Sequence, residues 1–260
     1  MSNRSLLALI LFSLLSYSAL AQTNATAGSC NKMVYLTFDT GNMSVAETVA
    51  EILKRHNVKA TFFLANEKTF RGDYALGDSW KSFWQMMVQE GHHFGSHTYD
   101  HDYFVKDGPR NEVFIKPQFG PEAGKTMLMS EASFCKDIRE VNQRFVELTG
   151  EPIQKIWRAP GGKTSPRLIS MGNLCGYQHI GWAPAGFLGD ELNSEQYPNA
   201  MLLEKASQGI KDGDITMAHL GIWSRKDPWA PAVLEALIVN LKKRGFCFAT
   251  LPKTSSNQSK

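Results

Sequence analysis

The sequence has little charge of either sign and no run of basic residues. Lys and Arg number 28 against 25 Asp and Glu, which gives a formal charge of +3. Proteins that bind nucleic acid usually carry a clustered basic face, so that class is not expected here. The content of hydrophobic residues, 43%, is ordinary for a folded globular chain, and the length allows a large core.

Long apolar runs are also missing, apart from one near the N-terminus. Leu6–Leu15 is too short to span a bilayer; Arg4 precedes it and Ala19–Ala21 follows it. A positive residue, an apolar stretch and a small-x-small site are typical of a secretory signal peptide. We therefore predict a signal peptide at 1–21 and export to the periplasm or the medium. The mature chain should have no membrane span and be monomeric.

Short apolar runs alternate with helical patterns along the rest of the chain. The strand-like runs are Met33–Phe38, Ala60–Leu64, His93–Ser96, Lys155–Trp157, Tyr177–Trp182, Asp214–Ala218 and Phe246–Leu251. The helical patterns are Val45–His56, Trp80–Gln89, Glu131–Thr149, Pro166–Asn173, Asn199–Gln208 and Ala230–Arg244. Repeated strand–helix units predict an α/β fold with a parallel sheet, and about seven such units suggest a barrel.

No linker or repeat divides the chain. We expect one domain at 33–252, with an N-terminal lead at 22–32 and a tail at 253–260. Residues 102–130 fit neither period and contain Pro109, Pro117 and Pro121, so they are expected to form a long surface loop.

Cysteine is scarce, and no CxxC pair suggests a zinc knuckle. Export would permit disulfides. Cys30 precedes the first predicted strand and Cys247 lies in the last, and these strands are neighbours in a nearly closed barrel. We therefore predict a Cys30–Cys247 bond. For Cys135 and Cys175, a bridge and two buried thiols remain equally open.

Polar residues directly follow four of the predicted strands. They are Asp39, His97, Arg158 and His219. The carboxyl ends of parallel strands form the edge at which catalytic groups gather in such folds, so these side chains are expected to share a site. His97 and His101 are spaced i, i+4, which suits two imidazole ligands of one divalent metal.

The ordered motifs Thr37–Gly41 (TFDTG), His97–His101 (HTYDH), Arg158–Gly162 (RAPGG) and the late Met217–His219 (MAH) resemble those of the polysaccharide deacetylase family, the NodB-homology domain. The resemblance covers roughly Val34 to Leu251. It implies a distorted (β/α) barrel and metal-dependent hydrolysis of N-acetyl groups on amino sugars. Zinc is the expected metal, with cobalt, nickel or manganese as alternatives.

The resemblance also implies roles for individual residues. Asp39 matches the general base, His219 the general acid, and Arg158 the cation that orients the base. His97 and His101 match the metal ligands. The family has a second metal-binding aspartate where this chain has Thr40, which is the third expected ligand but a poorer one. Either water, Asp39 or another carboxylate completes the metal site, or the metal binds weakly.

The remaining expected site residues are matched more loosely. Asp190 is the candidate carboxylate that supports His219, although a loop aspartate capping a turn explains it equally well. The expected substrate contacts are Tyr99, Pro160, Gly161, Trp182 and Trp223, with a backbone N–H near Tyr99 or Asp100 as an oxyanion donor. Trp80 and Trp84 are at helical spacing and are expected in the core.

These observations predict an exported N-deacetylase acting on an amino-sugar polysaccharide of the cell wall, peptidoglycan or a chitin-like glycan. Two alternatives stay open. One is a deacylase or deformylase of a lipid-linked sugar. The other is a catalytically inactive sugar-binding relative, which the threonine at position 40 would favour.

Overall fold

The computed structural model describes residues 30–252. The predicted signal peptide, residues 22–29 of the lead and the predicted tail lie outside the described residues. Among the helices of residues 30–252, none is both long enough and apolar enough to cross a membrane.

Most predicted elements are present, but the predicted strands Met33–Phe38 and Asp214–Ala218 are each divided into two. The predicted strands Tyr177–Trp182 and Phe246–Leu251 end three residues earlier than expected. The strands are β1 Lys32–Tyr35, β2 Thr37–Asp39, β3 Thr61–Leu64, β4 His93–Ser96, β5 Asp102–Asp107, β6 Val113–Pro117, β7 Met127–Met129, β8 Ile156–Trp157, β9 Gln178–His179, β10 Asp214–Ile215, β11 Ala218–His219 and β12 Phe246–Phe248. The α-helices are α1 Ala46–Arg55, α2 Lys81–Gln89, α3 Glu131–Thr149, α4 Pro166–Leu174, α5 Asn199–Gly209, α6 Trp229–Ala232 and α7 Leu234–Lys243. Short 3-10 turns are η1 Asp78–Trp80, η2 Pro160–Gly162 and η3 Pro184–Gly186.

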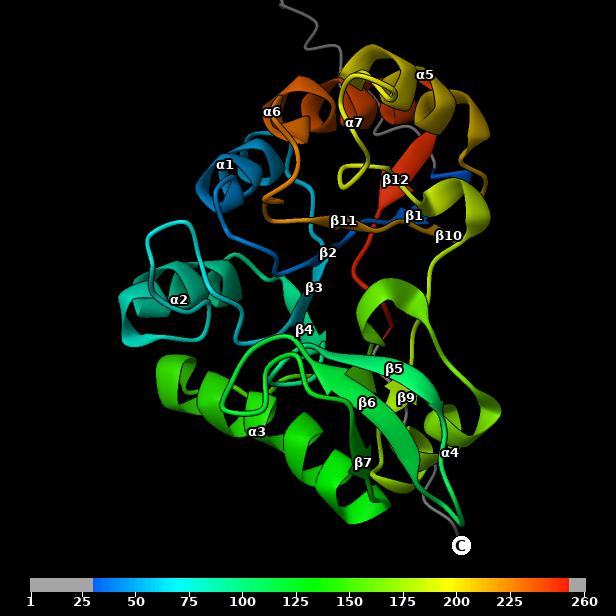
Figure 1. The fold of residues 1–260 in the computed structure, drawn as a ribbon. Coiled ribbons are helices and arrows are strands. Elements are labelled where there is room, and N and C mark those ends of the chain that lie inside the picture. Colours follow the sequence, from blue (N-terminus) through cyan, green and yellow to red (C-terminus); the bar gives the residue numbers. More distant parts are fainter. Residues whose placement is uncertain (1–29, 253–260) are drawn as a thin grey trace, which may run out of the picture.

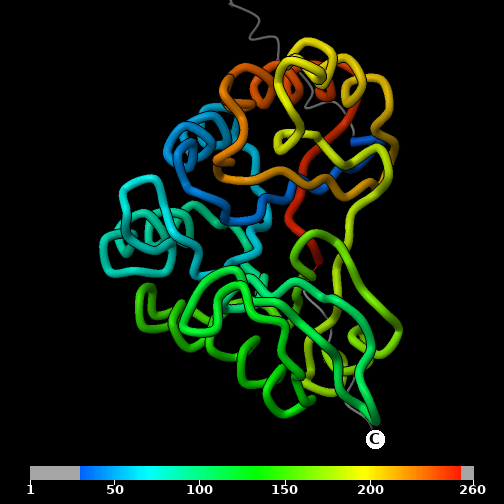
Figure 2. Tube along the Cα trace, viewed as in Figure 1, coloured from blue at the N-terminus to red at the C-terminus, as the bar shows by residue number. Residues whose placement is uncertain are grey.

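The parallel strands form two sheets, ordered β11-β2-β3-β4-β8-β9 and β10-β1-β12. The chain passes from one sheet to the other at Leu36, between β1 and β2, and again at Thr216 and Met217, between β10 and β11. Strands from the two ends of the chain therefore lie side by side, as Figure 2 shows for the blue and red segments. The predicted parallel α/β fold is confirmed; in the described region the hydrogen bonds make two sheets and not one closed ring.

The helices pack outside the sheets because each has one apolar face (Figure 1). In α1 this face consists of Val49, Ile52 and Leu53, all buried. Between sheet and helices, the rings of Phe38, Phe62 and Phe94 stack across β2, β3 and β4 at centroid separations of 5.5 and 5.9 Å. Trp80 and Trp84 are buried in the same core, as predicted.

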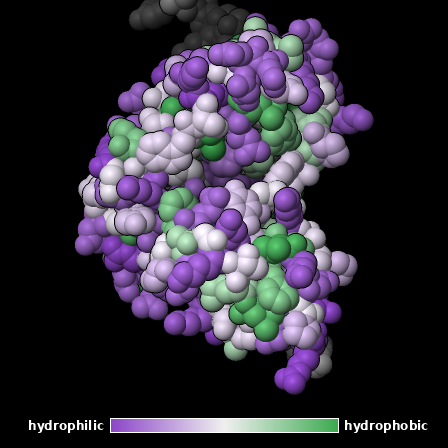
Figure 3. Space-filling model, in the orientation of Figure 1, coloured by the Kyte–Doolittle hydropathy of each residue, from purple (hydrophilic) through white to green (hydrophobic). Residues whose placement is uncertain are grey.

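The prediction of a surface loop at residues 102–130 is wrong, because these residues form the antiparallel sheet β5-β6-β7. Pro109 lies in the connection between β5 and β6, Pro117 ends β6, and Pro121 lies between β6 and β7. These prolines mark the ends of the strands, where a missing N–H is tolerated. The exposed residues of this sheet include Val105 and Leu128, and Figure 3 shows apolar atoms gathered over β5 and β6 on a mainly hydrophilic face.

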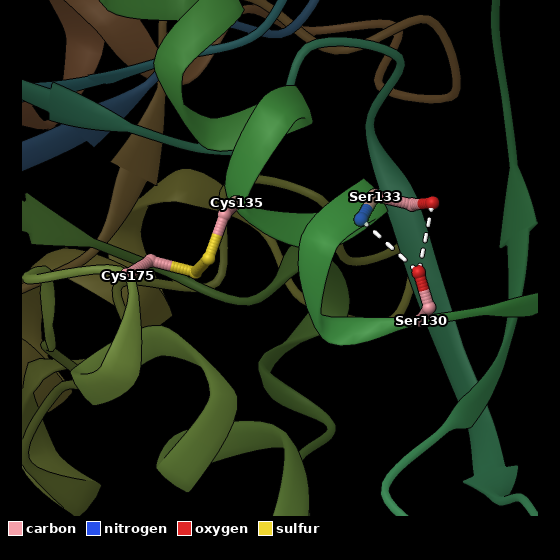
Figure 4. The surroundings of a disulfide bond; sticks show 4 residues. All are labelled: Ser130, Ser133, Cys135 and Cys175. Carbon is pink, nitrogen blue, oxygen red and sulfur yellow. Dashed lines mark hydrogen bonds between the residues drawn. A yellow bond between two sulfur atoms is a disulfide. The ribbon is translucent and has the colours of Figure 1, made fainter.

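Two disulfides join distant parts of the fold. The predicted Cys30–Cys247 bond is confirmed, with a Cα–Cα distance of 5.6 Å, and it ties the start of β1 to β12. Cys135 and Cys175, which the sequence left open, also form a bond. Figure 4 shows it joining α3 to the residue after α4, beside the Ser130 side chain that caps the start of α3.

Removing the Cys30–Cys247 bond should lower the free energy of unfolding. The bond spans 217 positions, for which the chain-entropy model gives about 5 kcal/mol as an upper figure. We expect the paired substitution Cys30→Ser with Cys247→Ser to unfold at lower denaturant in non-reducing buffer. The matched control is Cys135→Ser with Cys175→Ser, whose span of 40 sets a smaller limit of about 4 kcal/mol. An unchanged midpoint in the first variant would contradict the expectation.

Candidate active site

The four polar residues predicted to follow strands lie at one edge of the six-stranded sheet. Asp39 and His219 end the paired strands β2 and β11 and face each other in register. His97 directly follows β4 and Arg158 directly follows β8, and these two strands are also neighbours. The parallel topology therefore brings together residues that are up to 180 positions apart in the sequence.

Asp39 and Arg158 form a buried ion pair. Arg158 Nη1 donates to Asp39 Oδ1 at 2.8 Å, and the other guanidinium nitrogens donate to the carbonyls of Ile180 and Gly181. Burial opposes the charge of Asp39, but the Arg158 guanidinium with its hydrogen bond and the neighbouring imidazoles together outweigh this effect and lower the pKa of the carboxyl group. Asp39 is therefore an ionised and fixed carboxylate, as a general base requires.

His97 is held as a neutral ring. Burial lowers its pKa to about 4, and Nδ1 lies 3.0 Å from the carbonyl oxygen of Arg158. Because a carbonyl only accepts, Nδ1 carries the proton and Nε2 is left with a lone pair. Nε2 lies 3.5 Å from Asp39 Oδ2, so two electron-pair donors face each other there.

His219 is held in the opposite state. Its backbone N–H donates to Asp190 Oδ2 at 2.7 Å, and its Nδ1 lies 3.2 Å from the same oxygen. Burial opposes protonation, but the charge of Asp190 and this hydrogen bond raise the pKa of His219 to about 10. The structure thus brings Asp190 to His219, and His219 is a cation at neutral pH.

Sequence reasoning missed a further carboxylate, Glu67, which is buried. Its Oε1 accepts from Thr40 Oγ1 at 2.5 Å and from the Gly41 N–H at 2.8 Å. Burial opposes ionisation, but His101 and the Thr40 hydrogen bond lower the pKa of Glu67. Glu67 lies three residues after β3, so the argument from strand ends reaches this loop, but Asn66 and Lys68 made it look like an ordinary polar connection.

Asp39, Glu67, His101 and His219 share a pocket of about 440 Å³. Gly161, Trp182 and Trp223 of the predicted substrate contacts also line it, together with Tyr103. Trp223 remains 64% exposed, so its ring is available at the mouth.

Two other predicted substrate contacts are not part of this pocket. The backbone N–H of Tyr99 donates to the Asp137 carboxylate at 3.1 Å, so it is not free to act as an oxyanion donor. The Tyr99 ring faces a different hollow, formed with α3. Pro160 is buried under the turn that presents Gly161.

The chemistry of the donor atoms fits a zinc-like ion. His97 donates from Nδ1 to a carbonyl and keeps a lone pair on Nε2, and a neutral imidazole nitrogen is a usual ligand of zinc. His101 is also buried, and its Nδ1 has no hydrogen-bond partner. Within residues 30–252, however, no three His, Cys, Asp or Glu side chains are already grouped as a metal site. The donor residues are present, and their side chains would have to move to bring three of them onto one ion.

Comparison with known proteins gives consistent results. The family model described as polysaccharide deacetylase matches residues 27–180. A peptidoglycan-N-acetylglucosamine deacetylase, PgdA, from Listeria monocytogenes is 39% identical over 85% of this chain and 38% of its own length. A chitooligosaccharide deacetylase from Azorhizobium caulinodans is 25% identical over 84% of this chain and 92% of its own.

Solved structures also match this fold. A family 4 acetyl xylan esterase from Clostridium thermocellum, in complex with a cobalt ion, superposes with a TM-score of 0.63 and 26% identity, covering 85% of this chain and 88% of its own. A CE4 family pseudoenzyme from Bacillus anthracis superposes with a TM-score of 0.61 and 20% identity, covering 85% and 65%. The second likeness shows the fold alone, and because that protein is a pseudoenzyme, the fold does not guarantee turnover.

Proposed function

Because this chain belongs to the polysaccharide deacetylase family, we propose that it is an active, exported, metal-dependent N-deacetylase of a cell-wall amino-sugar polymer. The observation that carries the proposal is the pair of opposite protonation states at one pocket. Asp39 is an ionised carboxylate and His219 a cation, which are the states that a general base and a general acid need before the reaction starts.

Each proposed step follows from an atom at the pocket. Asp39 takes a proton from the water that attacks the acetamide carbon, and Arg158 keeps its carboxylate oriented. His219 gives its proton to the sugar nitrogen as the C–N bond breaks, because an amine anion is a poor leaving group. The products are acetate and a free amine on the sugar.

The metal would be held by His97 and His101, which have the unpaired ring nitrogens described above. When bound there, a divalent ion polarises the amide carbonyl and lowers the pKa of a water. Thr40 was also a predicted ligand. Its hydroxyl accepts from the Ala65 N–H and donates to Glu67, so its hydrogen-bonding capacity is largely in use.

The substrate class is inferred from the pocket walls and the relatives. Rings of Tyr103, Trp182 and Trp223 line a pocket with few cations, which suits a neutral sugar that stacks on aromatic side chains. The named relatives act on peptidoglycan N-acetylglucosamine and on chitooligosaccharides. Export is supported by the N-terminal pattern and by the two disulfides, which persist in oxidising compartments.

Acetate release from a panel of purified glycans tests this proposal. We expect release from peptidoglycan or chitooligosaccharide, and little from O-acetylated xylan. Acetate release from O-acetylated xylan alone would show that the enzyme cleaves an ester and not an amide. Binding of the glycans without any acetate release would support the inactive sugar-binding relative.

The pH dependence offers a second test through Asp190. The acid form of His219 is present below its pKa, so activity of the wild type should fall only as pH rises through about 10. In Asp190→Asn the charge and hydrogen bond that raise this pKa are weakened, and the alkaline limb of kcat/KM should move to lower pH. The control is Glu191→Gln. The charge of Glu191 also raises the pKa of His219, but less than that of Asp190 and without a hydrogen bond to the ring, so its alkaline limb should move less. If the alkaline limb of kcat/KM is the same in the wild type and in Asp190→Asn, His219 is not the general acid.

A further inference from the structure

The two carboxylate oxygens of Glu67 differ in their hydrogen bonding. Oε1 receives two donors, from Thr40 and Gly41, whereas no hydrogen bond within residues 30–252 reaches Oε2. A buried carboxylate usually has its remaining lone pairs satisfied, because desolvating an unpaired charge is costly. Glu67 also lines the pocket that holds His101.

The surroundings keep Glu67 in a fixed orientation. The Thr40 hydroxyl accepts from the Ala65 N–H at 3.2 Å, so its proton points to Glu67. Gly41 adds the second donor from a backbone with φ of +60°, and a Cβ at Gly41 would meet the Gly221 carbonyl oxygen at 2.2 Å. The loop after β2 therefore holds Glu67 Oε1 with two hydrogen bonds, whereas Oε2 receives none from the described residues.

A buried imidazole nitrogen without a partner among residues 30–252 lines the same pocket. This nitrogen is His101 Nδ1, and the side chains of His101 and Glu67 line the same pocket. The rings of His97 and His101 meet edge to face with centroids 4.9 Å apart. One carboxylate and two imidazoles of this kind are a usual ligand set for a divalent metal.

We propose that Glu67 is the acidic metal ligand of this protein and that Thr40 is the residue that positions it. The inference rests on the proposed function, because it concerns the same metal site. It assigns Thr40 a supporting role beside the metal in place of direct binding. It also identifies which carboxylate completes the site when position 40 carries no acid.

Metal titration of the purified, metal-free protein tests the proposal without relying on catalysis. Cobalt(II) would be added while visible absorption is recorded, with zinc competition giving the relative affinity. Glu67→Gln keeps the size of the side chain and an oxygen that can accept from Thr40 and Gly41, so it should fold. We expect its cobalt affinity to fall about tenfold or more, with a changed absorption band.

Two further variants sharpen the result. Glu191→Gln removes the same charge from the same pocket, and its cobalt affinity should stay near that of the wild type. The double variant Thr40→Asp with Glu67→Gln places the carboxylate at position 40, whose side chain lies 2.5 Å from that of Glu67. It should recover part of the lost cobalt affinity. Should Glu67→Gln be poorly folded by circular dichroism, Glu67→Asp keeps the charge with a shorter reach and should bind cobalt more weakly than the wild type.

The outcomes separate this inference from the proposed function. If the wild type binds cobalt and releases acetate while Glu67→Gln keeps full affinity and an unchanged spectrum, Glu67 is not a ligand and only this inference fails. If the wild type releases no acetate, the proposed function fails, and the titration still decides the role of Glu67. If Glu67→Gln and Glu191→Gln lose cobalt affinity equally, the loss comes from removing a negative charge in the pocket and not from removing a ligand. That result would overturn the inference.

Discussion

Asp39→Asn should lower the turnover number about a hundredfold or more, the usual size of a general-base effect. The amide has nearly the shape of the carboxylate but cannot take the proton from water. Sugar binding should persist, because the aromatic pocket walls do not change. Steady-state acetate release and glycan binding measured on the same preparation check both expectations.

The same substitution also removes the charge that faces Arg158, which is fully buried. Breaking such a pair typically costs about 3–5 kcal/mol, although the carbonyls of Ile180 and Gly181 still accept from the guanidinium. Unfolding curves must therefore accompany the kinetics. If Asp39→Asn is folded and retains wild-type turnover, Asp39 is not the base. If it loses its metal together with activity, Asp39 acts as a ligand.

His101→Ala should abolish stoichiometric divalent metal and, with it, acetate release. The imidazole is buried, lines the pocket and leaves Nδ1 unpaired, and a site with so few donors tolerates no loss of one. Metal content of the purified variant by elemental analysis is the direct measurement.

A histidine elsewhere gives the matched control. His56 pairs with Glu235 at 2.8 Å on the helical side of the fold, and His56→Ala should keep its metal. Full metal content and activity in His101→Ala would show that the i, i+4 pair is not the metal site.

The reasoning from strand ends was sufficient to assemble most of the site. Asp39, His97, Arg158 and His219 each follow an apolar run, and parallel strands place their carboxyl ends along one edge. This argument works because strand direction and helix crossovers are repeated regularly. It needs no knowledge of side-chain contacts.

The same reasoning could not identify Glu67, because the decisive fact is a contact. Position 67 is in a polar loop, and nothing in the order of residues distinguishes its carboxylate from a solvated one. Only the fold shows that the Thr40 hydroxyl and the Gly41 N–H converge on it. Tyr99 is the reverse case, since its motif suggested a substrate contact while its N–H is used by Asp137.

Residues 102–130 were misread for a related reason. In β5 the buried and exposed residues do not alternate, and within residues 30–252 β5 and β6 pair with each other and with β7. The sequence of β5 therefore lacks the period of two that predicts a strand, and the three prolines favour a loop. Pairing between neighbouring strands, which a single strand's sequence does not record, stabilises such a sheet.

We propose that this protein hydrolyses an acetamide with a bound divalent metal. Acetate and new primary amine formed from a chitooligosaccharide should be measured for the metal-loaded protein and for the same sample after chelation. We expect equal amounts of the two products with metal and neither product after chelation. Glycan binding with no acetate from the metal-loaded protein, or acetate formed without a matching amine, would contradict it.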